Sequence, residues 1–301
     1  MDLIDLQNRI KKSTSKIKMK TSGTTGKPKT IEHEILFLLG NTKPTRGGNI
    51  WLFTYNKLHM GGIQVLLQAI INNDTLVNAY RKDRDFIIKR IRECGVTNIS
   101  ATPTFYRLLL PIESPLEDVK RVSIGGERTD EYTVEIIRKM FPKAKINNIY
   151  ATTEAGAVLF SKNEKFKIND RVCIKDGILY VLTAEGISQK TGDLVELVGD
   201  GEFVFSGRNT DIINIAGNNV NPFEIEDILK SNNLIGDAVV YSKNHKLLGN
   251  VLACNLVLLG EFPKQQIRDF LKEMIDEKYK IPRIIKILKS IEMSETNKAI
   301  R

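Results

Sequence analysis

The sequence predicts an α/β protein in two parts: a layered α/β N-terminal domain with a small β section, and a small, mobile α+β C-terminal domain. Three observations support this fold class. Strand and helix patterns alternate from about residue 45 to 155, turn-rich strand patterns fill residues 159–204, and a separate mixture of both follows residue 207. Because alternation of strands and helices is typical of parallel sheets covered by helices, the first segment is expected to form the main sheet.

The alternating segment begins with the strand-like run NIWLFTY, which the helical run GGIQVLLQAII follows. The next helical run, RDFIIKRIREC, places apolar residues at helical spacing at Phe86, Ile87 and Ile91. A Thr–Asp pair begins a further predicted helix, which ends before Pro142. Strand-like runs lie between these helices, so the segment predicts several parallel strands joined by helical crossovers.

The rest of the chain predicts a small sheet and a second domain. The runs DGILYVLT, TGDLVELV and GEFVFSG are separated by glycine turns, as in antiparallel strands. Further on, PFEIEDILKS predicts a helix with Pro222 in its first turn, and KQQIRDFLKEMIDEKY predicts another helix among strand-like runs. We therefore predict a core domain at residues 1–208 and a C-terminal domain at residues 209–301.

Composition limits the classes of function. The chain has 301 residues, 42% hydrophobic and 27% charged, with a net charge of +9, and no apolar run is long enough to span a membrane. Cys94, Cys173 and Cys254 are scattered and form no CxxC motif, which argues against disulfides or a zinc site and predicts a cytoplasmic location. Lysine and arginine are spread without a basic and aromatic block, so we expect neither nucleic-acid nor membrane binding. The positive charge suits small polyanions such as ATP.

A glycine- and hydroxyl-rich stretch, KTSGTTGKPKT, lies at residues 20–30. Its glycines let backbone N–H groups turn toward an anion, and its lysines add positive charge. The spacing does not meet the Walker pattern, and the stretch alone is compatible with a phosphate-binding loop or with a flexible surface turn. The residues that would bind phosphates are Thr21, Ser22, Gly23, Thr24, Thr25, Gly26, Lys27 and Lys29.

Five motifs follow one another along nearly the whole chain: SGTTGKPK, NNIYATTEAG, TGDL, SGRNTDIINIAGNNVNPFEIEDIL and YKIPRIIKILKSIEMSETNKAIR. Their residues and order resemble those of the adenylate-forming superfamily, which contains acyl- and aryl-CoA synthetases, peptide-synthetase adenylation domains and luciferases. The closing motif and the run HMGG are also similar to those of some o-succinylbenzoate–CoA ligases. The resemblance implies an AMP-forming acid–thiol ligase that uses ATP and Mg²⁺ to convert a small carboxylic acid into an acyl-adenylate. A thiol would then take the acyl group, either from coenzyme A or from the phosphopantetheine of a carrier protein.

The same resemblance implies roles for individual residues. As catalytic groups, Lys298 would bridge the carboxylate and the α-phosphate, Thr153 would contact the α-phosphate, and Glu154 would carry Mg²⁺. The implied adenine and ribose contacts are Gly125, Gly126, Glu127, Asn148, Tyr150, Asp193 and Arg208. The implied acyl-pocket and thiol contacts are His59, Gly61 and Gly217, although a histidine beside a helix start is as often structural.

The chain departs from the family pattern at several places. Only Met1 to Lys20 precede the phosphate loop, where the family has a large subdomain, so we expect a short form of the family. Without that subdomain one face of the core would be exposed, and we expect another copy or a partner subunit to cover it. Ala151 and Asn297 replace glycines, and Thr210 stands at the hinge about which the family's C-terminal domain rotates. Two alternatives stay open: a non-catalytic nucleotide-binding or scaffold descendant, and a subunit completed by another chain.

Overall fold

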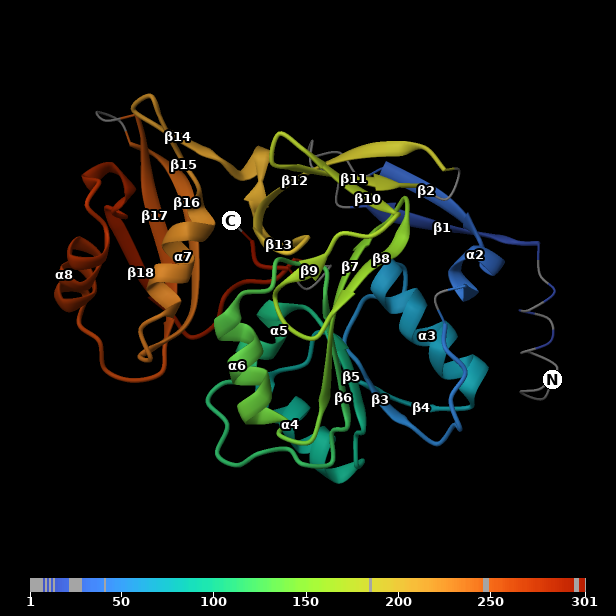
Figure 1. Cartoon of the computed structure of the whole chain (residues 1–301). Helices are drawn as coiled ribbons and strands as arrows, with labels where there is room; N and C mark the ends of the chain where they lie inside the picture. The colour runs from blue at the N-terminus through green and yellow to red at the C-terminus, as the bar shows by residue number, and fades with distance from the viewer. Residues whose placement is uncertain are drawn as a thin grey trace.

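A computed structural model of the chain describes residues 8, 10, 12, 14–21, 29–40, 42–183, 186–245, 249–294 and 298–300. Two lobes lie side by side in Figure 1. The core lobe comprises the described residues up to 208, and the C-terminal lobe comprises those from 213 onward. The mixed α/β architecture confirms the predicted fold class. The predicted domain boundary between residues 208 and 209 stays a prediction.

The main sheet of the core lobe has six strands in the order β4-β3-β5-β6-β7-β8. Their bounds are β3 (Ile50–Phe53), β4 (Thr75–Asn78), β5 (Asn98–Ala101), β6 (Arg121–Gly125), β7 (Lys145–Thr152) and β8 (Gly156–Ser161). Neighbouring strands from β4 to β7 run parallel, and β8 is antiparallel to β7. The strand order reverses between β3 and β5. In sheets of this kind, ligands bind in the crevice at the carboxyl ends of the strands, beside that reversal.

Helices cover both faces of the main sheet (Figure 1). The helices α4 (Arg84–Glu93), α5 (Pro103–Leu108) and α6 (Glu131–Met140) share one apolar core with the strands, in which Ile87 and Ile137 are fully buried. The helices α2 (Ile35–Leu39) and α3 (Met60–Asn72) belong to a separate apolar cluster. Asp83, Thr102 and Asp130 cap α4, α5 and α6 by accepting hydrogen bonds from backbone N–H groups three residues on.

Two smaller sheets complete the core lobe. β1 (Lys16–Thr21) and β2 (Lys29–Glu34) form an antiparallel hairpin that packs near α3. The second sheet has the order β10-β11-β12-β13-β9 and is antiparallel throughout. Its strands are β9 (Phe166–Lys167), β10 (Val172–Lys175), β11 (Ile178–Leu182), β12 (Ser188–Gly199) and β13 (Glu202–Arg208). It is the small β section that the turn-rich runs predict.

The C-terminal lobe has its own apolar core, in which Ile225, Val240 and Leu271 are buried. Its sheet has the order β16-β17-β18, with β17 antiparallel to β16 and parallel to β18. The 3-10 turn η1 (Asn209–Asp211) joins β13 to this lobe. The lobe's elements are β14 (Ile213–Ile215), β15 (Asn218–Val220), α7 (Pro222–Lys230), β16 (Ile235–His245), β17 (Gly249–Leu258), α8 (Lys264–Met274), η2 (Lys278–Lys280) and β18 (Ile284–Leu288).

Two further observations bear on the expectations from composition. Within the described ranges, no helix has the length and apolar character needed to cross a membrane. Cys94, Cys173 and Cys254 are free thiols, as their scattered spacing predicts.

Candidate functional site

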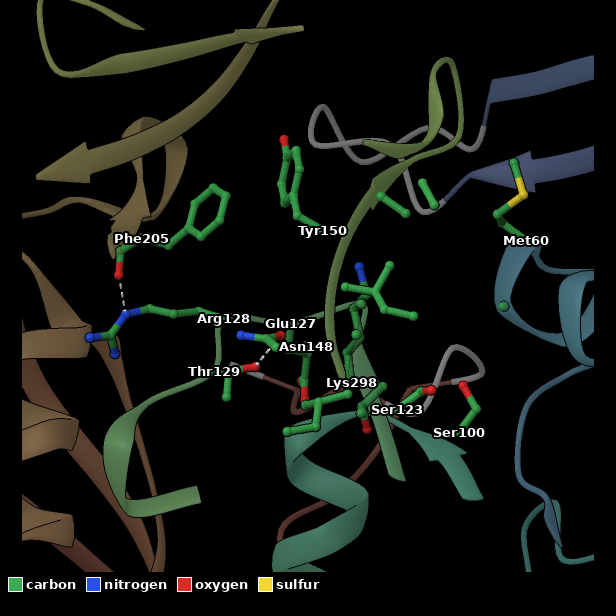
Figure 2. Close-up of a pocket in the computed structure, with 18 of the residues that line it drawn as sticks. Met60, Ser100, Ser123, Glu127, Arg128, Thr129, Asn148, Tyr150, Phe205 and Lys298 are labelled. Atoms are coloured by element: carbon green, nitrogen blue, oxygen red, sulfur yellow. Dashed lines mark hydrogen bonds between the residues drawn. The ribbon is translucent and has the colours of Figure 1, made fainter. Parts of the chain in front are cut away.

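A pocket of about 1070 Å³ lies at the carboxyl edge of the main sheet. Residues that follow successive parallel strands line it: Tyr55 after β3, Thr102 after β5, Glu127 after β6 and Thr153 after β7. The carboxyl ends of parallel strands meet at one edge of a sheet, so residues far apart in sequence become neighbours there. The C-terminal lobe adds Lys298 to the same pocket (Figure 2).

Most of the predicted site residues line this pocket. They are His59, Gly61, Gly125, Gly126, Glu127, Asn148, Tyr150, Thr153, Glu154, Asp193, Arg208 and Lys298. Ser22, Gly23, Thr24, Thr25, Gly26 and Lys27 lie outside the described residues, and Thr21 and Lys29 are described only as strand backbone. Gly217 is absent from the pocket lining and sits at the exposed turn between β14 and β15, with a φ of +88°. Its predicted contact with a thiol stays a prediction.

An aromatic and carboxylate corner of the pocket is built by β7, β12 and β13. Asp193 and Arg208 are paired across β12 and β13, and Arg208 Nε donates to Asp193 Oδ1 at 2.6 Å. The Tyr150 hydroxyl donates to Asp193 Oδ2 at 2.6 Å. The Tyr150 ring stacks on Phe205, with ring centroids 4.7 Å apart. Burial and then the Asp193 charge raise the pKa of Tyr150 far above its usual value, so its hydroxyl remains a proton donor. This corner offers a flat aromatic surface beside polar groups, which suits a nucleoside.

Asn148 lines the pocket, and both polar atoms of its side-chain amide already make hydrogen bonds. Its Nδ2 donates to the carbonyl oxygen of Asn163 at 2.9 Å, and its Oδ1 accepts from Thr129 Oγ1 at 3.1 Å. The contact of Asn148 with an adenine amino group therefore stays a prediction. At the neighbouring Gly125, a Cβ atom would lie 3.1 Å from the carbonyl oxygen of Ile149, so the bare glycine allows β6 and β7 to approach closely.

Thr153 and Glu154 lie in the turn that joins β7 to β8. His33 on β2 reaches this turn, and its Nε2 donates a hydrogen bond to the carbonyl oxygen of Thr153. The carbonyl can only accept, so this ring nitrogen must carry the hydrogen. His33 is 8% exposed and stacks on Phe37 with ring centroids 4.8 Å apart. No motif points to His33. The available signal is alternation, which places His33 and Ile31 on the same face of β2.

Glu154, the residue predicted to carry Mg²⁺, lies on the wall of the pocket. Among the described residues, no cluster of three or more His, Cys, Asp or Glu side chains is arranged to bind a metal ion. A single carboxylate on a pocket wall nevertheless fits Mg²⁺, which proteins bind through one or two carboxylates together with substrate phosphates and water. The donor set therefore fits a magnesium ion that arrives with a nucleotide.

Lys298 lies near the end of the C-terminal lobe and lines the pocket. Its backbone N–H donates to Ser294 Oγ at 3.2 Å, and its carbonyl accepts from the N–H of Ser294 at 2.8 Å. Its side chain passes Gly126, where a Cβ atom would lie 3.9 Å from Lys298 Cε. Burial and then Arg208 lower the pKa of Lys298, and the nearby carboxylates partly oppose them. The structure thus brings the C-terminal lysine to the predicted nucleotide site.

The predicted acyl side of the pocket lies at the start of α3. His59 immediately precedes this helix and lines the pocket with Met60. A Cβ atom on Gly61 would lie 3.3 Å from the ring of Tyr55, so the glycine packs flat against that ring. At Gly62 a Cβ atom would lie only 2.1 Å from the carbonyl oxygen of Asn56, which requires glycine there. The acyl-pocket roles of His59 and Gly61 stay predictions.

Three ion pairs that no motif predicts join the two lobes. They are Arg107–Asp237 at 2.7 Å, Arg128–Asp227 at 2.6 Å, and Lys230–Asp130. We call them the interlobe ion pairs. The side chains of Arg107 and Asp237 are only 8% and 6% exposed. Although burial opposes the shift, Lys230 and Arg107 hold the pKa of Asp130 well below its usual value.

These features define an α/β protein with a nucleotide-sized pocket that a second lobe completes with a lysine. The family model described as AMP-binding enzyme matches residues 16–209, and the model described as AMP-binding enzyme C-terminal domain matches residues 224–298. The chain belongs to the AMP-binding enzyme family. This membership confirms the predicted adenylate-forming class and the prediction that the chain is an enzyme.

Individual relatives agree with the predicted similarity to o-succinylbenzoate–CoA ligases. The 2-succinylbenzoate–CoA ligase of Bacillus subtilis is 26% identical over 348 residues, covering 99% of this chain and 70% of that relative. The solved o-succinylbenzoate coenzyme A synthetase of the same species, in complex with ATP and magnesium ion, is 25% identical. Its TM-score is 0.68, and the match covers 94% of this chain and 68% of that one. An anthranilate CoA ligase in complex with anthranoyl-AMP is 15% identical with a TM-score of 0.74, covering 94% of this chain and 65% of that one, and supports the fold alone. The chain thus spans about two thirds of the length of these proteins.

Proposed function

We propose that the chain joins a small carboxylic acid to ATP, giving an acyl-adenylate and pyrophosphate, and then transfers the acyl group to the thiol of coenzyme A. One observation carries the proposal. Lys298 of the C-terminal lobe lies in the same pocket as the Tyr150–Asp193 corner and the Thr153–Glu154 turn. A cation that enters a nucleotide-sized pocket from a second lobe suits a reaction between two anions.

In the first half-reaction, a carboxylate oxygen attacks the α-phosphorus, and the bond from that phosphorus to pyrophosphate breaks. Both reactants are negatively charged, so the protein contributes mainly by positioning and by neutralising charge. The Lys298 ammonium would lie between the carboxylate and the α-phosphate, and Thr153 would contact that phosphate. Glu154 would hold Mg²⁺, which when bound neutralises phosphate charge. Tyr150, Asp193 and Arg208 would hold the nucleoside, and residues 21–29 would hold the outer phosphates.

In the second half-reaction, the thiol sulfur attacks the acyl carbon, AMP leaves, and a thioester forms. Coenzyme A is supported as the thiol by the names of the ligases that the chain resembles. The C-terminal lobe would rotate about Thr210 in η1 and bring the turn at Gly217 toward the thiol. We accordingly assign the nucleotide and acyl site to residues 1–208 and the lysine-bearing swivelling domain to residues 209–301. Assembly with another copy or a partner subunit, and a cytoplasmic location, remain part of the proposal.

The proposal is tested by incubating the purified chain with ATP, Mg²⁺ and a library of carboxylic acids. We expect at least one acid to support exchange of labelled pyrophosphate into ATP, with the acyl-adenylate detected by mass spectrometry. Coenzyme A and a phosphopantetheinylated carrier protein are then offered in separate reactions. If a thioester forms only with the carrier protein, the carrier protein and not coenzyme A is the acceptor. ATP binding without exchange across the library would contradict the enzyme function and favour a nucleotide-binding scaffold.

A further inference from the structure

Glu127 connects the two lobes through both oxygens of its carboxylate. Oε2 accepts from the backbone N–H of Thr104, in the first turn of α5, at 3.1 Å. Oε1 accepts from the backbone N–H of Ala299, in the C-terminal lobe, at 2.8 Å. Ala299 directly follows Lys298, so the second bond holds the backbone that carries the lysine. Hydrogen bonds from N–H groups to a carboxylate are short and about twice as strong as bonds between neutral groups.

Glu127 also acts on Lys298 through its negative charge. Burial, and then the charge of Arg208 on β13, disfavour the charged form of Lys298 and lower its pKa. Glu127 after β6, Asp193 on β12 and Asp211 in η1 favour the charged form. Of these three carboxylates, Asp193 already accepts from Arg208 and Tyr150. Glu127 therefore combines a negative charge near Lys298 with a direct hold on the adjoining backbone.

We propose that Glu127 is a positioning residue for Lys298, holding the lysine in the pocket for adenylation and releasing it when the C-terminal lobe rotates. This inference rests on the proposed function, since it assigns Lys298 to the first half-reaction. The Glu127–Ala299 bond joins residues of different lobes, so it exists only while the lobes are docked as they are here. It assists adenylation and contributes nothing to thioester formation in the rotated arrangement. Contact of Glu127 with adenine is not needed for this role.

The test compares Glu127→Ala, Glu127→Gln and the control Glu135→Gln, a carboxylate on the exposed face of α6. Each half-reaction is measured separately, adenylation by pyrophosphate exchange and thioester formation from supplied acyl-adenylate. Loss of both carboxylate bonds in Glu127→Ala should lower adenylation by about 10- to 100-fold. Thioester formation should change less than about twofold, and the control should match the parent protein. Equal losses in both half-reactions would overturn the proposal, because a general loss of structure affects both.

The pH profile provides a readout that a purely structural role would leave unchanged. Adenylation needs charged Lys298, so its rate should fall at alkaline pH as that ammonium loses its proton. Glu127→Gln removes a negative charge that favours the ammonium, so the pKa of Lys298 should fall further. The alkaline limb should then move to lower pH relative to the parent and to Glu135→Gln. An alkaline limb at the parent position would contradict the charge part of the proposal.

One measurement independent of turnover separates this inference from the proposed function. Hydrogen–deuterium exchange of the C-terminal peptide should show the Ala299 N–H protected in the parent and exchanging about tenfold faster in Glu127→Ala. Unchanged exchange at Ala299 would overturn the inference even if the parent adenylates an acid. If exchange at Ala299 is faster in Glu127→Ala but the parent protein adenylates no acid, the contact exists, and its catalytic role is overturned along with the proposed function.

Discussion

The two lobes meet through two kinds of contact, which both involve residues of the pocket lining. The interlobe ion pairs place charged side chains of α7 and β16 against α5 and the segment just before α6, with Arg107 and Asp237 almost fully buried. The second kind of contact is the hydrogen bond between Glu127 and the backbone beside Lys298. Breaking a buried ion pair leaves an uncompensated charge, whereas water can partly replace a hydrogen bond to a half-buried carboxylate. We infer that the ion pairs set how the lobes dock and that the pocket contact sets where Lys298 lies within that arrangement.

This difference means that chemistry and docking can be disrupted separately. Changes at the pocket contact should alter adenylation without altering unfolding. Changes at the interlobe ion pairs should alter both. The following variants test that separation.

Lys298→Ala is expected to have the largest effect, because it removes the cation that stabilises the developing charge. Removing one such group lowers the rate by roughly 10²- to 10³-fold. Pyrophosphate exchange should fall by that factor, while ATP affinity, measured by calorimetry, and the thermal midpoint should stay near parent values. Undiminished exchange would remove Lys298 from the mechanism.

Asp237→Asn is expected to destabilise the protein by about 3 kcal/mol, because it leaves the Arg107 charge buried without its counter-charge. The temperature of the unfolding midpoint and the rate of pyrophosphate exchange should both decrease. The matched control is Asp269→Asn, which removes the exposed ion pair with Lys272 on α8 and should leave the thermal midpoint nearly unchanged. Similar losses in the two variants would show that the interlobe ion pairs are no more important than surface pairs.

Thr210→Pro tests whether η1 is the hinge between the two lobes. A proline fixes φ and disfavours the rotated backbone by about 3 kcal/mol where that backbone is incompatible, or roughly a hundredfold. Thioester formation from supplied acyl-adenylate should fall by about that factor, and pyrophosphate exchange should be spared. Parallel loss of both half-reactions would place the hinge elsewhere.

His33→Phe tests a smaller effect within the core lobe. Phenylalanine can stack on Phe37 as His33 does, but it cannot donate to the carbonyl of Thr153. Losing one hydrogen bond should raise the KM for ATP about tenfold, because the Thr153–Glu154 turn is less firmly held against the hairpin that carries the predicted phosphate loop. His33→Gln retains an N–H donor at the same distance along the side chain and should stay within about threefold of the parent. If both variants behave alike, the hydrogen bond has no role in the site.

Local patterns in the sequence predict much of the core lobe. The helical spacing of Phe86, Ile87 and Ile91 and the cap at Asp130 correspond to α4 and α6. The β1–β2 hairpin is harder to predict. Its strands alternate polar and apolar residues, which is a strand signal, but no two-residue turn joins them and so nothing local indicates that they pair. Its place is set by burial of Met19 against α3, a contact between distant segments.

The residues of the site also divide into those that sequence motifs predict and those that only the packing of the elements brings together. Tyr150, Asp193, Arg208 and Lys298 belong to motifs, and the structure brings them into one pocket. His33 belongs to no motif, and no motif indicates which residues pair across the lobes, because each contact joins residues about 100 or more positions apart. A single sequence carries no record of such pairings, since partners on different elements are chosen by how those elements pack. The hold of Glu127 on the lysine backbone is likewise visible only once the lobes are docked.

Lysine footprinting tests most directly the claim that the C-terminal lysine meets the nucleotide in the core pocket. The chain is treated with an amine-acylating reagent with and without ATP and Mg²⁺, and each lysine is quantified by mass spectrometry. We predict that the nucleotide reduces modification of Lys298 several-fold while the exposed Lys264 and Lys286 of the same lobe are unchanged. Equal modification of Lys298 in both conditions, with ATP shown to be bound, would contradict the account.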